Sequence, residues 1–315
     1  MNCIVVTGAT GMLGAALIRA AIQHGTKKIY AVVRPGTKKL YRLPTHPSVV
    51  PIVCGVEELS ALPEMIADKC DVFYHFAWSL TGAHRNEDIT EQGRNVVYTL
   101  EAIQAAAKLG CKKFVGAGSQ AEYGVIDRET IGPETPVNPI QPYGIAKYAA
   151  GQLALASAKL LQIHCVWVRI FSVYGIYDKP TTMICASLRK LLRGEQTAFT
   201  PATQHWDYLF SEDAGEAFWL IGMNGKDQSI YCLGSGKALP LYQYIEQMRN
   251  IVCPGRDMGI GKLPFPAKGI KRLCADISTL QQDTGFVPKT TFSDGIRLTL
   301  EYLQKELSIE MNRSE

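Results

Sequence analysis

The sequence lacks a long apolar run, a dense block of charge and any paired cysteine motif. No apolar stretch reaches the ~18 residues that a membrane-spanning helix requires, and no run of lysine and arginine exceeds two residues. The net charge of +4 over 315 residues is too small to indicate a nucleic-acid partner. Nine cysteines, an odd number without CxxC spacing, predict reduced thiols and neither a disulfide framework nor a metal site.

The first residues also lack the basic segment of a secretory signal peptide. With 47% hydrophobic and 20% charged residues, the composition is that of an ordinary soluble enzyme with enough apolar material for a sizeable core. We therefore expect a cytoplasmic protein that binds no membrane, nucleic acid or metal.

Three glycines stand at GxxGxxG spacing near the start of the chain. They lie between Cys3–Val6, whose apolar run predicts a strand, and Met12–His24, whose periodicity predicts a helix. In such a turn Gly8 permits the tight bend, Gly11 lets a pyrophosphate approach the backbone, and Gly14 lets the helix pack on the strand. Because the helix N-terminus offers unpaired N–H groups, the motif predicts a bound dinucleotide. The predicted contacts here are Thr7, Gly8, Thr10, Gly11, Met12, Leu13 and Gly14.

Tyr143 and Lys147 stand four residues apart at the start of a second apolar helix. This spacing places the phenol and the ammonium on one helical face. A nearby cation favours the phenolate and lowers the pKa of tyrosine, which is about 10 in water. The pair therefore suits proton transfer to or from a hydroxyl or carbonyl group.

Strands and helices alternate through the first half of the chain, a pattern typical of a parallel, doubly wound α/β sheet. The predicted strands are Cys3–Val6, Lys28–Val33, Val49–Cys54, Val72–Phe76, Lys113–Ala117 and His164–Ile170. The predicted helices are Met12–His24, Ser60–Asp68, Asn95–Leu109, Tyr143–Leu161, Thr182–Leu192, Ser211–Met223, Leu241–Asn250 and Ser293–Leu307. We expect residues 1–175 to form a dinucleotide-binding domain. Residues 176–315 would form mainly a smaller substrate lobe, with some segments returning to the first sheet.

With these motifs in view, the chain resembles the extended short-chain dehydrogenase/reductase family, in its epimerase/dehydratase branch that acts on nucleotide sugars. The resemblance runs from Val6 to about Leu303. It is carried by TGATGMLG at Thr7–Gly14, DVFYHFAW at Asp71–Trp78, GSQAEYG at Gly118–Gly124, PYGIAK at Pro142–Lys147, RIFSVYG at Arg169–Gly175 and WDYLFSEDAGEAF at Trp206–Phe218. It implies a Rossmann-type sheet, a nicotinamide dinucleotide and a nucleotide-sugar substrate.

The resemblance also implies a catalytic set of Ser119, Tyr143 and Lys147. Ser119 matches the family's catalytic Ser or Thr, and Lys147 would bond the nicotinamide ribose. Sugar-nucleotide 4,6-dehydratases usually follow this serine with Asp-Glu, but here Gln120 and Ala121 follow it. An amide and a methyl group cannot exchange protons in that way, so dehydration is not expected. Glu122 comes next, and we expect it to point elsewhere.

Cofactor choice depends on the end of the second strand, where Arg34 stands in place of the acidic residue that would signal NAD. The planar fork of an arginine suits a 2′-phosphate, so we favour NADP(H) and keep NAD(H) as the alternative. The resemblance places Phe76, Ala77 and Trp78 at the nicotinamide. The Asp that often contacts adenine after the third strand is missing from Cys54–Glu57.

Substrate contacts are expected from Ser79, Gln120, Ala121, Ser172, Trp206 and Arg272. Trp206 stands where many relatives carry a diphosphate-binding arginine, and Ser172 where many carry asparagine. Arg189, Arg193, Lys268 and Arg272 are candidate replacements for that arginine. We favour a reductase of a nucleotide-linked 4-keto sugar, which includes 4-keto-6-deoxy sugars. The alternatives are an NAD-dependent 4-epimerase and a non-catalytic dinucleotide sensor.

Two predicted helices, Asn95–Leu109 and Tyr143–Leu161, are rich in alanine. Proteins that the chain resembles often dimerise there through a four-helix bundle, so a homodimer is expected. Asn95 matches a position that usually braces the sheet.

Overall fold

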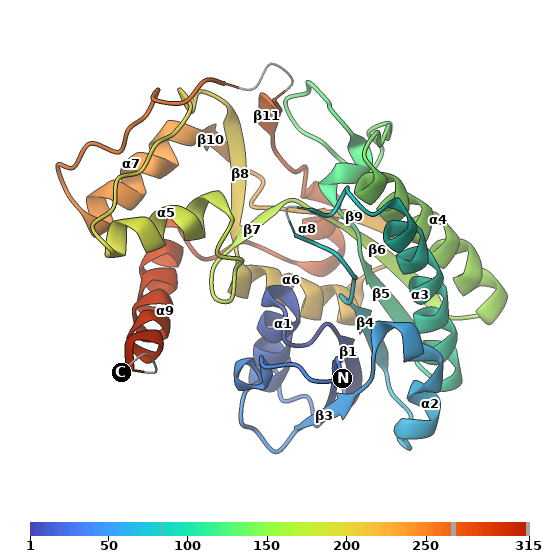
Figure 1. The fold of residues 1–315 in the computed structure, drawn as a ribbon. Coiled ribbons are helices and arrows are strands. Elements are labelled where there is room, and N and C mark those ends of the chain that lie inside the picture. Colours follow the sequence, from blue (N-terminus) through green and yellow to red (C-terminus); the bar gives the residue numbers. More distant parts are fainter. Residues whose placement is uncertain (83, 266–268, 313–315) are drawn as a thin grey trace.

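Seven parallel strands form the larger of two sheets (Figure 1). The computed structural model describes residues 1–82, 84–265 and 269–312. The sheet has the order β3-β2-β1-β4-β5-β6-β9, so the chain steps outward from β1 in both directions. Its strands are β1 (Cys3–Thr7), β2 (Lys28–Val33), β3 (Val49–Val53), β4 (Val72–His75), β5 (Lys113–Ala117), β6 (His164–Ile170) and β9 (Ser229–Leu233). This topology confirms the predicted Rossmann-type α/β fold.

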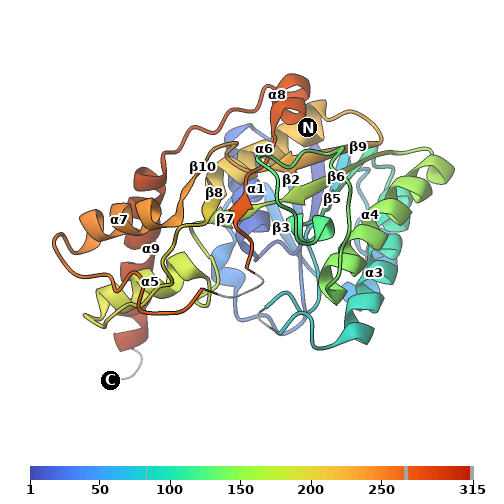
Figure 2. The same ribbon diagram turned by 90° about the horizontal axis from the view of Figure 1, so that it is seen from above.

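Helices cover both faces of this sheet, with α1, α6 and α8 on one face and α3 and α4 on the other (Figure 2). The short α2 packs on the same face as α3 (Figure 1). The bounds of these helices are α1 (Met12–Gln23), α2 (Leu62–Met65), α3 (Ile89–Lys108), α4 (Pro142–Leu161), α6 (Ser211–Asn224) and α8 (Ser278–Thr284). The alanines of α3 and α4 lie partly in the core, where Ala102 and Ala154 are fully buried. Small side chains at these points let the helices lie close to the strands.

A second, smaller sheet is built around β8, which pairs with β7, β10 and β11. Its strands are β7 (Ser172–Tyr174), β8 (His205–Phe210), β10 (Ala238–Pro240) and β11 (Arg272–Leu273). The helices α5 (Met183–Leu192), α7 (Leu241–Val252) and α9 (Phe292–Asn312) pack around it. Leu188, Ile245 and Leu303 lie in their shared core. This part lies beside the larger sheet, with α5 and α9 set apart from α3 and α4 (Figure 2).

Some elements differ from the prediction. A helix over Ser60–Asp68 is wrong, because a 3₁₀ segment at Val56–Ala61 leads into α2, which ends at Met65 where the backbone of Ile66 becomes extended. Helix α3 begins before Asn95, since the Asp88 side chain caps it by accepting a hydrogen bond from the N–H of Glu91 at 2.9 Å. The sequence pattern also misses β7 to β11 and α8. Two further 3₁₀ segments cover Leu40–Arg42 and Gln120–Tyr123.

Candidate active site

The glycine-rich turn has the geometry that its spacing predicts. Gly8 has a φ of 67°, and a Cβ there would lie 2.8 Å from the backbone nitrogen of Ala77. A Cβ on Gly14 would collide with the carbonyl oxygen of Gly8. Gly11 is the N-cap of α1 and donates its N–H to Gly8 at 2.9 Å. The turn therefore leaves the N-terminus of α1 open to a phosphate.

A cavity of about 520 Å³ runs beside this turn and brings together most of the predicted cofactor contacts. The predicted residues that line it are Thr7, Gly8, Thr10, Gly11, Arg34, Phe76, Ala77, Trp78 and Ser79. Met12 and Leu13 line the neighbouring cavity instead. The cavity is also lined by Thr37 and Thr81, which were not among the predicted contacts. Gly55 and Glu57 line it at the place where the adenine-contacting Asp of many relatives is missing. The residues present therefore fit a dinucleotide.

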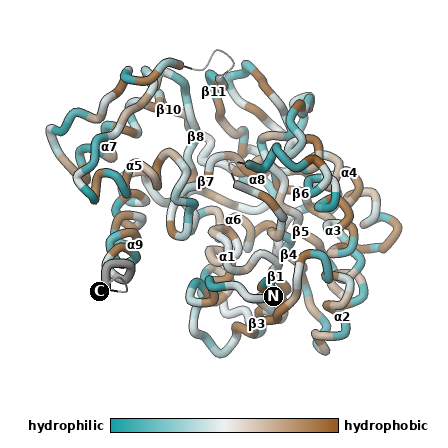
Figure 3. The backbone as a smooth tube through the Cα atoms, viewed as in Figure 1, coloured by the Kyte–Doolittle hydropathy of each residue, from teal (hydrophilic) through white to brown (hydrophobic). Residues whose placement is uncertain are grey.

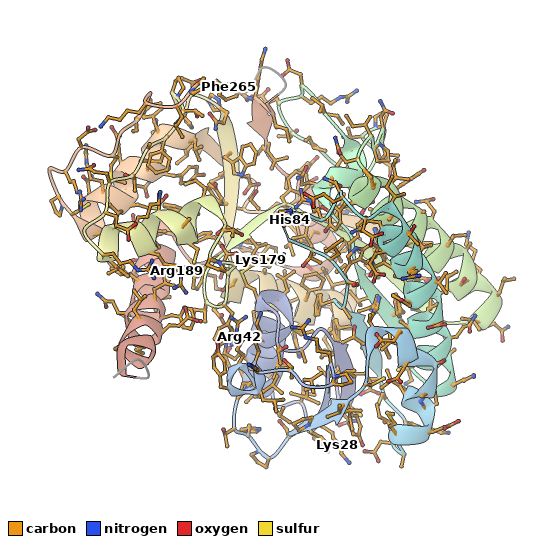
Figure 4. All side chains as sticks on the ribbon, in the orientation of Figure 1. Lys28, Arg42, His84, Lys179, Arg189 and Phe265 are labelled. Carbon is orange, nitrogen blue, oxygen red and sulfur yellow. The ribbon has the colours of Figure 1, made fainter. Side chains whose placement is uncertain are left out.

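Positive charge gathers at the end of β2, where Lys39 lines the cofactor cavity together with Arg34. Burial and the positive charges of Arg42 and Arg34 lower the pKa of Lys39. The cations repel one another, and an anion bound between them would offset this repulsion. Arg42 also donates to the carbonyls of Thr10 and Tyr177, at 3.5 and 3.4 Å. It thus joins the glycine-rich turn to the segment that follows β7 (Figure 4).

The second cavity, about 580 Å³, contains the predicted proton-transfer residues Ser119 and Tyr143. Ser119 follows β5, and Tyr143 lies in the first turn of α4, where its backbone N–H donates to the side chain of Asn86 at 3.1 Å. Burial raises the pKa of Tyr143, while the Ser119 hydroxyl, by hydrogen bonding, and the charge of Arg85 lower it. The net effect keeps this phenol protonated at neutral pH.

Lys147 is buried and lines neither of these cavities. Its Nζ donates to the carbonyl of Ala117 at 2.7 Å and lies 3.5 Å from the centre of the Trp78 ring. Burial lowers the pKa of Lys147 to about 7. The expectation that Lys147 lowers the pKa of Tyr143 is wrong for this conformation, because Nζ is 6.0 Å from the centre of the Tyr143 ring and faces Ala117. The cation that does so is Arg85, whose guanidinium carbon is 4.8 Å from the ring centre.

Glu122 points away from the cavity into the protein, as expected. Its carboxylate accepts from the backbone N–H of Ser119 at 2.8 Å, from Trp167 at 3.0 Å and from Arg169 at 2.8 Å. The Ser119 side chain caps the same short 3₁₀ segment by accepting from the N–H of Ala121 at 3.2 Å. This reciprocal capping fixes the backbone of Ser119, the predicted catalytic serine.

The predicted substrate residues fall in different places. Ser172 and Trp206 line the 580 Å³ cavity and bond to each other, with the indole N–H donating to Ser172 Oγ at 2.7 Å. Gln120 also lines it, whereas Ala121 lines a smaller cavity of about 150 Å³ on another side of Tyr143. Ser79 lines the cofactor cavity, and its N–H donates to Asn95 Oδ1 at 2.7 Å, so Asn95 braces this segment.

None of the candidate replacements for the missing diphosphate-binding arginine lines the substrate cavity in the part of the chain that the structure describes. Arg272 on β11 faces Glu129 at 3.7 Å, and Arg189 pairs with Glu306 of α9. Arg193 is the C-cap of α5, and Lys268 lies outside the described residues. The cations that line the cavity are instead Arg85 and Lys179. Neither residue was among the predicted contacts, because each lies in a loop whose path no periodicity predicts.

Within the described ranges, no three His, Cys, Asp or Glu side chains are placed to hold a metal ion. No described helix combines the length and the apolar character that a membrane crossing needs. All nine cysteines are free thiols.

Comparison with known proteins agrees with this geometry. Residues 4–234 match the model of the NAD dependent epimerase/dehydratase family. A dTDP-glucose 4,6-dehydratase of Streptomyces niveus is 25% identical over 95% of this chain and 92% of its own length. A UDP-glucose 4-epimerase of Lactobacillus helveticus is 25% identical over 94% of this chain and 95% of its own.

Among solved structures, MoeE5 in complex with UDP-glucose and NAD superposes with a TM-score of 0.82 at 24% identity, covering 97% of this chain and 100% of that one. Fold, glycine-rich turn and family match agree with one another. The chain therefore belongs to the NAD dependent epimerase/dehydratase family, whose members are oxidoreductases and epimerases of the extended short-chain dehydrogenase/reductase type.

Proposed function

We propose that this chain is a cytoplasmic, NADP(H)-dependent reductase of a nucleotide-linked 4-keto sugar. The observation that carries the proposal is that Ser119 and Tyr143 line a cavity of about 580 Å³ beside a cavity suited to a dinucleotide. Thr81 lines both, so the two ligands would meet at this point. Residues 1–175 would carry the cofactor, and most of residues 176–315 would shape the substrate side.

Tyr143 is the proton donor in this proposal. The nicotinamide, when bound, supplies the hydride that reduces the substrate carbonyl carbon. Because burial raises the pKa of Tyr143, the phenol is protonated at neutral pH and ready to protonate the carbonyl oxygen. Ser119 hydrogen-bonds the same oxygen, and the Arg85 cation stabilises the phenolate that remains.

The preference for NADP(H) is supported by Arg34 and Lys39, which line the cofactor cavity together. A 2′-phosphate would supply the anion that separates their charges. MoeE5, a protein of similar fold, binds NAD, so NAD(H) is the alternative that must be tested against NADP(H).

Dehydration has little support from this site, although a dTDP-glucose 4,6-dehydratase is among the relatives. The two positions after Ser119 carry Gln120 and Ala121, which cannot act as acid and base. Glu122 is buried against Arg169 and cannot reach the substrate.

A 4-epimerase is the second candidate, because the L. helveticus relative is a UDP-glucose 4-epimerase. An epimerase would use the same predicted catalytic set, Ser119, Tyr143 and Lys147, and would keep its cofactor bound through the catalytic cycle. Turnover separates the candidates, since a reductase consumes one NADPH per product. An epimerase converts sugar nucleotides without added cofactor and leaves the NADPH absorbance unchanged. A sensor protein would do neither.

We also propose a homodimer formed through α3 and α4. Their outward sides expose Val97, Ile145 and Leu153, with 52%, 49% and 44% of each residue accessible. Figure 3 shows apolar residues along both helices. An apolar surface across two adjacent helices suits burial against a second copy.

A further inference from the structure

The wall of the substrate cavity carries an arginine that has no acidic partner among the described residues. Arg85 lies between β4 and α3 and lines both the 580 Å³ cavity and the 150 Å³ cavity beside Tyr143. Its guanidinium carbon is 4.8 Å from the centre of the Tyr143 ring. Among the described residues, no carboxylate lies within 4.0 Å of this guanidinium, and no acceptor bonds to it.

Hydrogen bonds from a buried side chain of α3 fix the backbone around Arg85. Gln92 of α3 is 1% exposed, and its Nε2 donates to the carbonyls of Arg85 at 2.8 Å and Leu80 at 3.0 Å. The N–H of Arg85 donates to Gly82 at 3.2 Å. The buried Gln92 amide therefore fixes the backbone of this loop at the edge of the cavity, and with it the position from which the Arg85 side chain extends.

The remaining charges leave the cavity positive. Lys179 lines it as a second cation, and its Nζ donates to the carbonyl of Thr81 at 2.5 Å (Figure 4 labels Lys179). Asp178 is the one carboxylate among the described lining residues. Its oxygens already accept from the backbone N–H of Lys179 at 2.7 Å and from the Thr182 hydroxyl at 2.8 Å. A ligand that neutralises Arg85 must therefore bring its own negative charge.

We infer that Arg85 binds a carboxylate on the sugar ring, so that the substrate is a nucleotide-linked uronic acid or its 4-keto form. This inference rests on the proposed function, in which the reacting carbonyl meets Tyr143. The sugar ring separates that carbon from the diphosphate, whereas Arg85 lies directly against Tyr143. A carboxylate next to the reacting carbon matches the planar fork of a guanidinium in two parallel hydrogen bonds.

The test compares three ligands for each of uracil, thymine, cytosine and guanine: the free nucleoside diphosphate, its glucose conjugate and its glucuronate conjugate. Calorimetric titration in the presence of NADP⁺, and separately of NAD⁺, gives the dissociation constants. We expect wild-type protein to bind one glucuronate conjugate at least ~10-fold more tightly than the matching glucose conjugate. Arg85→Met should weaken the binding of that glucuronate conjugate by about 10- to 100-fold, the range expected for the loss of a charge-assisted hydrogen bond. The dissociation constants of the free nucleoside diphosphate and of the glucose conjugate should change little.

Two further variants keep the result interpretable. Arg85→Lys retains the charge but loses the fork, and it should recover part of the preference. Arg297→Met removes an equal charge from α9, where Arg297 pairs with Asp294 at 3.0 Å, and should leave all three ligands unaffected. Equal wild-type binding of glucose and glucuronate conjugates would overturn the inference while leaving the proposed function intact. Equal weakening of all three ligands by Arg85→Met would assign Arg85 to the diphosphate and also overturn it. If no nucleotide sugar binds with any base, the proposed function itself fails.

Discussion

The ammonium of Lys147 is covered by the indole of Trp78, whose ring centre lies 3.5 Å from Nζ. The indole is held in turn by its N–H, which donates to Gln92 Oε1 at 2.9 Å. The family resemblance implies that Lys147 bonds the nicotinamide ribose. In this conformation Trp78 covers Lys147, so a ribose bonded to Lys147 would have to displace the indole.

Trp78→Ala should therefore tighten NADPH binding, by about tenfold, because the cost of breaking a desolvated cation–π contact is removed. Fluorescence titration of NADPH measures the dissociation constant. Trp219→Ala is the matched control, since Trp219 stacks on His24 at 3.6 Å, away from both cavities. Weaker binding by Trp78→Ala would show that the indole is a cofactor contact in its present place.

The free energy of unfolding of Lys147→Met, measured relative to that of the wild type at the same pH, should be higher at pH 7 than at pH 10. Burial lowers the pKa of Lys147 to about 7 in the folded chain, against about 10.4 when unfolded. Between these values the unfolded state binds more protons, so the wild type gains stability as pH rises and the variant does not. Urea unfolding at several pH values measures the difference in free energy.

Lys190→Met removes an exposed lysine from α5 and is the control for the loss of a lysine side chain. A difference in unfolding free energy between Lys147→Met and wild type that does not change with pH would mean that Lys147 stays charged when folded.

Arg34→Asp should shift cofactor preference from NADPH to NADH, because a carboxylate repels the 2′-phosphate and accepts from a ribose diol. We expect at least ~10-fold weaker NADPH binding, with NADH unchanged or tighter. Lys38→Met serves as control, since Lys38 does not line the cofactor cavity. Unchanged affinity for both cofactors would show that Arg34 does not read the phosphate.

Leu153→Glu should convert the proposed dimer to monomers by placing a charge in the apolar surface of α4. Sedimentation velocity measures the oligomeric state. Leu298→Glu is the matched control, because Leu298 on α9 has a similar exposure, 42% against 44%. A monomeric wild type, or dimers of the Leu153 variant, would contradict the proposed interface.

The sequence predicts six of the seven strands of the larger sheet and misses β9. The six are continuous apolar runs, and the glycines of the first turn are required for steric reasons. Gly8 needs a positive φ, and Gly14 has no room for a Cβ. The second sheet was not predicted, because strands as short as Arg272–Leu273 have no readable period.

The substrate wall was predicted less well than the cofactor wall for a similar reason. Ser172 and Trp206 could be selected by position, but their mutual hydrogen bond could not. Arg85 and Lys179 depend on loops that tertiary contacts position, such as the bonds from Gln92 to the Arg85 segment. Local sequence carries no record of such contacts.

The most direct test of the central claim follows NADPH absorbance with a panel of 4-keto sugar nucleotides, uronates included, for wild type and Tyr143→Phe. The wild type should oxidise one NADPH per molecule of reduced sugar. The variant should bind NADPH normally yet lose at least ~10²-fold in rate, the usual contribution of a general acid. Near-normal turnover by Tyr143→Phe, or no NADPH oxidation by the wild type with any member of the panel, would contradict the account.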